Sequence, residues 1–276
     1  MKKTFTIIVA LLWAPLLFAN DEIGVFEKIL ESSESFFPTN RALEQAIAGS
    51  QLELQATHDV RVPGNKHKAR LYVLTSPAFT EAAAGESPRT ASALILRRAV
   101  FTSGDQHDTF VNMANPVAHA MIYFADSPNY DALVAAAGDA AAELRDLVRT
   151  IPGQVVSVQG EPLRSEKHYN KFKGDGPARM MAKFRNFEKS QLVILEDDAA
   201  NFDAVIEKVT AAIANSSVSA ADDTTGWEQV ALIRLRDDAV YIGVTNPYIE
   251  DKMVRINSRF RKDGKSDLSP YPGVDH

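Results

Sequence analysis

Cysteine is absent from this chain of 276 residues. Without a thiol, the protein cannot form a disulfide, bind zinc or an iron–sulfur cluster through thiolates, use a cysteine nucleophile or attach a c-type haem covalently. Hydrophobic residues make up 45% of the chain, charged residues 24% and aromatic residues 8%. This composition is typical of a folded globular protein with a sizeable core, and it excludes a disordered, collagen-like or low-complexity chain.

Long apolar runs are scarce as well, and the one candidate lies at the N-terminus. Lys2 and Lys3 precede an uncharged, mostly apolar stretch over residues 7–18, and Ala19 offers a small residue for cleavage. The stretch is shorter than the roughly 20 residues that span a bilayer. The pattern therefore predicts a signal peptide over residues 1–19 and a periplasmic protein that no later segment anchors in the membrane.

Hydrophobic spacing and turn residues predict a mixture of helices and strands in the rest of the chain. We expect helices over residues 35–50, 127–150 and 202–213. We expect strands over residues 52–60, 69–75, 91–102, 109–114, 192–196, 227–235 and 239–245. The polar residues Arg236-Asp237-Asp238 predict a tight turn between the last two strands.

Two segments of the chain are similar to each other. Ala46-Ile47-Ala48-Gly49-Ser50 and Ala212-Ile213-Ala214-Asn215-Ser216 each follow a phenylalanine by ten residues. Farther on, Val73-Leu74-Thr75-Ser76-Pro77 parallels Gly243-Val244-Thr245-Asn246-Pro247. The interpretation we favour is an α+β fold of two related antiparallel-sheet-plus-helix units that arose by internal duplication; the alternative is chance similarity.

The predicted domains follow from this repeat. A first α+β domain occupies residues 20–160, a basic loop or linker residues 161–190, a second α+β domain residues 191–260, and a C-terminal tail residues 261–276.

The segment Phe110–Met121, FVNMANPVAHAM, joins a strand to a helix through Asn-Pro. With the helix and strands before it, this element resembles a bacterial family of uncharacterised domains whose α+β fold is grouped with that of the TATA-binding protein. The resemblance covers residues 36–125 and, more faintly, residues 190–256. The family usually has a glycine after Asn-Pro, where this chain has Val117-Ala118-His119. The resemblance implies a fold and no established activity.

Positive charge is concentrated in two stretches, although the whole chain carries a net charge of −6. Residues 165–189 hold seven basic and three acidic residues, and residues 252–265 hold six basic residues and one acidic residue. We expect the two stretches to meet in a basic groove with aromatic side chains, suited to an anionic small molecule or an acidic protein partner. The expected ligand-binding residues are Lys167, His168, Tyr169, Lys171, Phe172, Lys173, Arg179, Arg185, Arg255, Arg259 and Arg261. The alternative is a pair of ordinary solvated faces.

Nucleic acid is not expected as a partner, because export removes the usual target and the overall charge is negative.

Two other classes of function remain open. His119 and His168, with nearby methionines, are candidate ligands for a metal or a haem iron, although core packing is the commoner role of methionine. A hydrolase-like enzyme would have to use His58 beside Asp59, or His107 beside Asp105 and Asp108. The sequence contains none of the common catalytic or nucleotide-binding motifs, so we assign no catalytic residue and no cofactor. The hypothesis is an exported binding or accessory protein of unknown oligomeric state.

Overall fold

The computed structural model describes residues 22–60, 67–102, 107–172, 201–220 and 223–248. The strands are β1 (Phe26–Ser32), β2 (Glu53–Asp59), β3 (Ala69–Thr75), β4 (Leu96–Thr102), β5 (Thr109–Ala114), β6 (Gly153–Gln159), β7 (Ser217–Ala220), β8 (Asp223–Gly226), β9 (Glu228–Arg236) and β10 (Ala239–Thr245). The α-helices are α1 (Phe36–Ala48), α2 (Pro77–Ala82), α3 (Pro116–Tyr123), α4 (Tyr130–Asp146), α5 (Glu166–Tyr169) and α8 (Phe202–Ala214). Two 3₁₀ helices, η2 (Pro88–Leu94) and η3 (Leu147–Thr150), complete the described elements.

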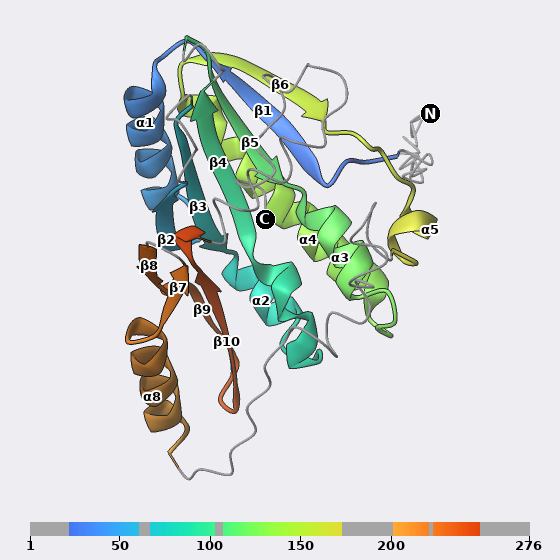
Figure 1. Cartoon of the computed structure of the whole chain (residues 1–276). Helices are drawn as coiled ribbons and strands as arrows, with labels where there is room; N and C mark the ends of the chain where they lie inside the picture. The colour runs from blue at the N-terminus through green and yellow to red at the C-terminus, as the bar shows by residue number, and fades with distance from the viewer. Residues whose placement is uncertain (1–21, 61–66, 103–106, 173–200, 221–222, 249–276) are drawn as a thin grey trace, which may run out of the picture.

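Six strands form one antiparallel sheet in the order β2-β3-β4-β5-β1-β6 (Figure 1). The first strand of the chain therefore pairs between β5 and β6 and is not at an edge. One row of paired residues crosses all six strands, in the order Thr57, Tyr72, Arg98, Met113, Glu27 and Gln159.

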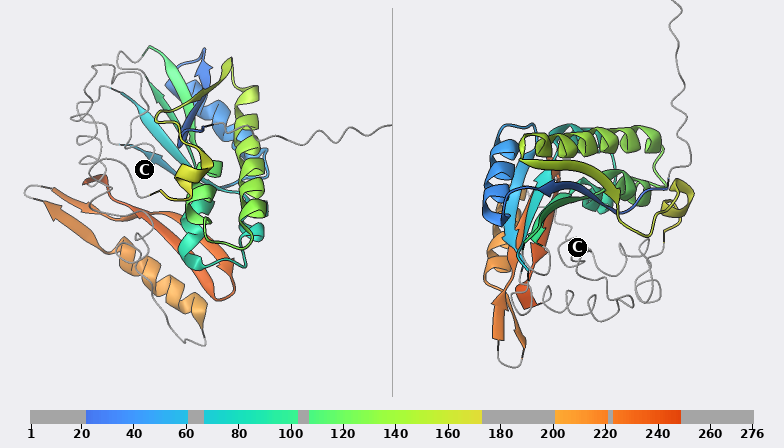
Figure 2. Two further views of the ribbon diagram at one scale, coloured as in Figure 1. Left: turned by 90° about the vertical axis from the view of Figure 1, so that its right-hand side faces the viewer. Right: turned by 90° about the horizontal axis from the view of Figure 1, so that it is seen from above.

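Helices α1 and α4 cover one face of this sheet (Figure 2). Leu43 and Ile47 of α1 and Leu133 and Leu144 of α4 are buried in the main core, together with alternate residues of the strands. Because successive strand residues point to opposite faces, one side chain in two reaches this core. Helix α4 buries mainly small residues, Ala137, Ala140 and Ala141, which allow it to lie close to its neighbours.

Strands end in the same way at three places in the chain. Ser76, Asn115 and Asn246 each follow a strand and precede a proline. Their side-chain oxygens accept hydrogen bonds from the backbone N–H groups of Phe79, Val117 and Tyr248. The proline cannot continue a strand ladder and suits the first turn of a helix, so the dipeptide turns the chain from strand to helix.

The C-terminal part consists of α8 and two hairpins, β7–β8 and β9–β10. Strand β9 lies beside β2 and β3 at the edge of the large sheet (Figure 1). Its Ile233 is 4% exposed and belongs to the same core as α1 and α4. The two parts of the molecule are thus joined through apolar packing at β9.

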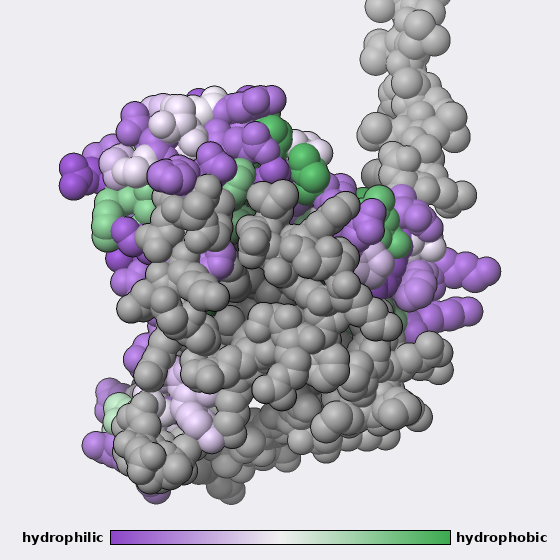
Figure 3. Space-filling model, turned by 45° about the horizontal axis from the view of Figure 1, so that its top comes forward, coloured by the Kyte–Doolittle hydropathy of each residue, from purple (hydrophilic) through white to green (hydrophobic). Residues whose placement is uncertain are grey.

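The surface seen in Figure 3 is mostly hydrophilic where it is described, with a few separate apolar patches. Val155 and Val158 of the edge strand β6 are about half exposed. No helix in the described ranges is both long and apolar enough to cross a membrane.

The α+β class and the antiparallel sheet predicted from the sequence are confirmed, while the duplication stays a prediction. The predicted strand over residues 91–102 is wrong at its start, because residues 88–94 form η2 and β4 begins only at Leu96. Ser87 and Pro88 explain the difference: the Ser87 hydroxyl accepts from the N–H of Arg89 and starts a helical turn. The predicted turn at Arg236-Asp237-Asp238 is confirmed, and the predicted strand 192–196 lies outside the described residues.

Candidate functional site

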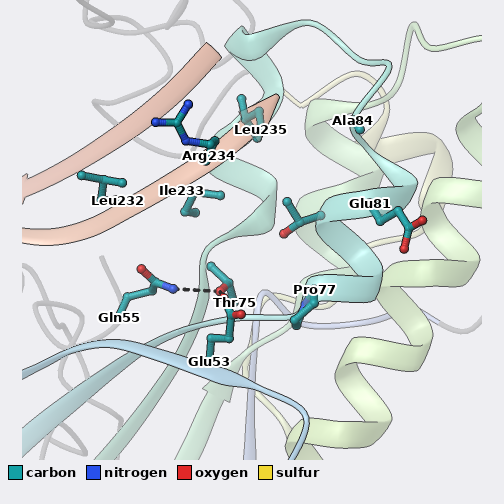
Figure 4. Close-up of a pocket in the computed structure, with 11 residues that line it drawn as sticks. Glu53, Gln55, Thr75, Pro77, Glu81, Ala84, Leu232, Ile233, Arg234 and Leu235 are labelled. Atoms are coloured by element: carbon teal, nitrogen blue, oxygen red, sulfur yellow. Dashed lines mark hydrogen bonds between the residues drawn. The ribbon is translucent and has the colours of Figure 1, made fainter. Parts of the chain in front are cut away.

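A hollow of about 520 Å³ lies between β9 and the surface formed by β2, β3 and α2 (Figure 4). A volume of this size is in the range of small-molecule sites, roughly 300–1,000 Å³. The residues that line it are Glu53, Gln55, Thr75, Pro77, Thr80, Glu81, Ala84, Leu232, Ile233, Arg234 and Leu235.

The residues at the end of β3 fix the position of α2, which forms part of the wall of the hollow. Ser76 accepts a hydrogen bond from the Phe79 N–H at 3.4 Å, and Pro77 opens the helix. The buried Phe79 ring packs edge-on against Phe124, with ring centroids 6.3 Å apart. This packing holds α2 so that Glu81, which is exposed, lies at the rim of the hollow.

A chain of hydrogen bonds orients the polar side of the hollow. Gln55 Nε2 donates to Thr75 Oγ1 at 3.0 Å, and Thr75 Oγ1 donates to Glu53 Oε2 at 3.3 Å. Figure 4 shows the three side chains together, with the β9 segment across from them. Thr75 is only 3% exposed, so it is a fixed point that limits the directions the Glu53 carboxylate can take.

The opposite wall combines an apolar strip with one cation. Ile233 is buried, and Leu232 and Leu235 are half-buried. Arg234 pairs with Asp203 of α8, and its guanidinium lies 5.9 Å from the centre of the Phe202 ring. Because Asp203 balances Arg234, the carboxylates of Glu53 and Glu81 decide the sign of the hollow, which is negative.

The predicted basic groove falls only partly within the described residues. Lys167, His168 and Lys171 are exposed on and after α5, whereas Tyr169 and Phe172 are buried. The remaining residues predicted for the groove lie outside the described ranges: Lys173, Arg179, Arg185, Arg255, Arg259 and Arg261.

Tyr169 and Phe172 pack with this chain's own residues. They share a small core with Ala118 and Ile122 of α3, and the Tyr169 hydroxyl donates to the Ile23 carbonyl at 2.7 Å. The Arg164 guanidinium lies 5.1 Å from the centre of the Phe172 ring. The ring surfaces that we expected a ligand to cover are therefore covered by the protein itself. The two rings hold α5 and the residues after it against α3.

The two histidines predicted as metal ligands lie in different environments. His119 is 8% exposed; its Nε2 lies 3.4 Å from Arg97 Nη2, and its ring meets Tyr123 edge-on. His168 is exposed beside Phe172. Burial raises the pKa of Tyr123 to about 12, against an opposing effect of the Arg97 charge. Among the described residues there is no group of three or more His, Asp or Glu side chains placed to hold a metal ion.

The residues considered for catalysis are separated by the fold. Arg70 donates two hydrogen bonds, of 2.6 and 3.0 Å, to the Asp59 carboxylate. Asp59 is therefore engaged by Arg70 and is not the carboxylate that orients His58. His58 Nδ1 lies instead 3.3 Å from Glu228 Oε2, at the start of β9. His107 is exposed, and Asp105 lies outside the described residues.

Sequence reasoning missed both the hollow and the His58–Glu228 pair. Each depends on β9 lying beside β2, and these strands are more than 160 residues apart in the chain. The signal that was available was the Thr75-Ser76-Pro77 segment, which we interpreted only as part of an internal repeat.

Comparisons with known proteins add one structural similarity. No family model and no curated protein matches the chain. A solved structure described as "uncharacterized conserved protein DUF302 from Bacillus stearothermophilus" is similar over 45% of this chain and 97% of its own, with 13% sequence identity and a TM-score of 0.37. The functional argument therefore starts from this chain's own residues.

Proposed function

We propose that this is an exported binding protein that holds a small molecule with a cationic group and an apolar body in the hollow between β9 and α2. The observation that carries the proposal is the charge of the hollow. Glu53 and Glu81 line it, while its arginine, Arg234, is already paired with Asp203. A carboxylate that is oriented in advance loses less freedom when a ligand binds, and Thr75 orients Glu53 in this way.

The shape of the expected ligand follows from the two walls. An amine or similar cation would lie between the carboxylates, and an apolar chain or ring would lie along Leu232, Ile233 and Leu235. Burial of apolar surface supplies most of the binding free energy in such a site, and the charged groups fix orientation and specificity.

The test uses two probes of the same skeleton and opposite charge, 4-phenylbutylamine and 4-phenylbutyrate. We expect isothermal titration calorimetry to detect binding of the amine and not of the carboxylate. The double variant Glu53→Gln, Glu81→Gln should bind the amine at least about tenfold more weakly, which corresponds to about 1.4 kcal/mol.

The control is a double variant that removes two exposed carboxylates beside β1 and β6, at the edge of the large sheet opposite β2, Glu22→Gln with Glu161→Gln. It changes the net charge by the same amount and should leave binding of the amine unchanged. If both double variants weaken binding equally, the amine responds only to the overall charge of the protein, and the assignment to the hollow fails.

A second candidate function is an anion-binding groove built from residues 165–189 and 252–265. The charge distribution favours it, since these stretches carry a net charge of +9 and the remainder of the chain after residue 19 carries −17. Under this alternative, 4-phenylbutyrate or inorganic phosphate binds and the double variant Arg179→Ala, Arg259→Ala loses binding. The two candidates thus predict opposite preferences for the charge of the probe.

We also propose that α1 with its following strands and α8 with its following strands arose by duplication. The support is local: Ser50 Oγ and Ser216 Oγ both donate to the carbonyl of an isoleucine three residues earlier, each at 2.8 Å. The experiment that bears on this proposal is an experimental structure of the complete chain, in which residues 191–260 should superpose on the α1–β2–β3 unit.

A further inference from the structure

Arg98 lies in the middle of the six-stranded sheet, on the face covered by α1 and α4. It is paired in register with Tyr72 on one side and Met113 on the other, and its side chain is 0% exposed. Leu96 and Val100, two residues away on the same face, belong to the main core. A guanidinium at this position is surrounded by the apolar interior.

None of the three side-chain nitrogens of Arg98 has a hydrogen-bond partner within the described part of the chain. Burial lowers the pKa of Arg98 to about 9, although the charge of Glu27 acts in the opposite direction. The side chain is therefore still protonated at neutral pH and presents five N–H donors to the core.

The carboxylate whose charge acts on Arg98, that of Glu27, is already engaged by other groups. Glu27 accepts hydrogen bonds from Arg145 Nε at 3.1 Å, from Arg145 Nη2 at 2.6 Å and from Ser157 Oγ at 2.8 Å. Tyr72, the neighbour on the other side, directs its hydroxyl to Asn40 and Glu44. Arg98 of the sheet and Arg145 of α4 thus share the single carboxylate of Glu27, and Arg145 takes its hydrogen bonds.

We propose that Arg98 is the ligand of a small inorganic anion, chloride being the simplest, which binds in the core between the sheet and the helix layer. A buried charge is strongly unfavourable unless it is paired, and an anion supplies both the opposite charge and the acceptor. Helix α4 contributes small side chains, Ala137, Ala140 and Ala141, to the core on this face of the sheet. The anion binds the folded protein and not the unfolded chain, so it acts as a stabilising ligand.

The first test compares thermal unfolding in sodium chloride and in sodium gluconate at equal ionic strength, because gluconate is too large for the core. We expect chloride to raise the melting temperature of the wild-type protein in a saturable way, by about 5 °C. Arg98→Met should remove this difference. Arg97→Met is the matched control, because Arg97 is the next residue on the strand and faces the other side of the sheet, near His119; it should retain the difference.

The second test does not depend on a variant that folds. Bromide soaked into crystals of the wild-type protein should give an anomalous peak within hydrogen-bond distance of the Arg98 guanidinium. Bromide found only on the surface would be an adventitious ion only and would overturn the proposal. A chloride effect that persists in Arg98→Met would overturn it as well.

Discussion

Helices α1 and α8 have the same length, 13 residues, and similar apolar spacing, yet they lie in different surroundings. Each begins with a phenylalanine, and two residues after its end a serine hydroxyl donates to the carbonyl of an isoleucine in the last turn. Helix α1 buries Phe36, Leu43 and Ile47, whereas α8 has no buried residue. The comparison teaches that a helix pattern determines which face is apolar, and the partner surface determines how much of that face is removed from water.

The partner surfaces differ in size. Helix α1 packs on the large sheet and shares a core with α4, while α8 contacts mainly β9 of a two-stranded hairpin. Two strands cover less of a helix than six strands and a second helix do, so the apolar side chains of α8 remain half-buried. The six-stranded part should therefore dominate the stability of the molecule.

The largest expected effect comes from the charged pairs of the two parts. Glu27 is fully buried and paired with Arg145, whereas Asp203 and Arg234 are both exposed. Glu27→Ala should lower the free energy of unfolding by about 3–5 kcal/mol, because it leaves Arg145 without its partner and the buried Arg98 without the one carboxylate whose charge acts on it. Asp203→Ala should lower it by less than about 1 kcal/mol. Urea denaturation of the two variants measures the difference, and equal losses would contradict it.

The second comparison uses two isoleucines at matching positions. Ile47 of α1 is 3% exposed, and Ile213 of α8 is half-buried. Ile47→Ala should cost about 2–5 kcal/mol because it creates a cavity. Ile213→Ala should cost about 1 kcal/mol or less, since part of its surface is already in water. A loss for Ile213→Ala as large as that for Ile47→Ala would show that α8 is covered in solution by a surface that the described residues do not provide.

A third prediction concerns acid. Burial of the Glu27 carboxyl raises its pKa, but the hydrogen bonds from Arg145 and Ser157 and the Arg145 charge outweigh burial, so the net pKa is lowered from 4.5. The pair therefore contributes its full stability above about pH 4.5 and loses it as the pH falls through the lowered value. Glu27→Gln should be less stable than the wild type at pH 7, and the gap should narrow toward pH 3. If the difference in unfolding free energy between the wild type and Glu27→Gln stayed constant from pH 7 to pH 3, the Glu27 carboxyl would not titrate in this range, and the prediction would be wrong.

The smallest effect should be the same in both parts. Ser50→Ala and Ser216→Ala each remove a hydrogen bond of 2.8 Å to the last turn of a helix. Each should cost about 0.5–1.5 kcal/mol, the net contribution of one ordinary hydrogen bond. Chemical denaturation in parallel would check this, and a loss confined to Ser50→Ala would indicate that even this local bond depends on burial.

Much of the fold could be predicted from the sequence, and the reasons are local. Alternation identified β2, β3, β5, β9 and β10, and helical spacing identified α1, α4 and α8. The strand β1 was missed, because residues 26–32 contain charged residues at both faces and Glu27 is fully buried. A glutamate is ordinarily exposed, and hydrogen bonds from Arg145 and Ser157, 118 and 130 residues away, make the burial of Glu27 acceptable.

The candidate site was less predictable than the fold. The residues expected to bind a ligand were the basic residues of two stretches of the chain and the aromatic residues between them. Of these, Tyr169 and Phe172 are buried in a small core with residues of α3. The hollow combines Glu53 from β2, Glu81 from α2 and Leu235 from β9. No feature of the sequence near any of these residues shows that they meet, because the contact depends on the packing of β9 on the edge of the sheet.

The sequence by itself excluded thiol-based chemistry and determined the α+β class. It also determined the positions of many helices and strands and the Ser-Pro and Asn-Pro ends of three strands. These features depend on composition, on the spacing of apolar residues and on hydrogen bonds within a few residues. The tertiary structure alone decided that α1 is packed in a core and α8 is not, and that Glu27 pairs with Arg145. It also decided that Arg98 lies in the core with no hydrogen-bond partner among the described residues. Burial and pairing are properties of surfaces brought together from distant parts of the chain, and they are set by packing and not by local pattern.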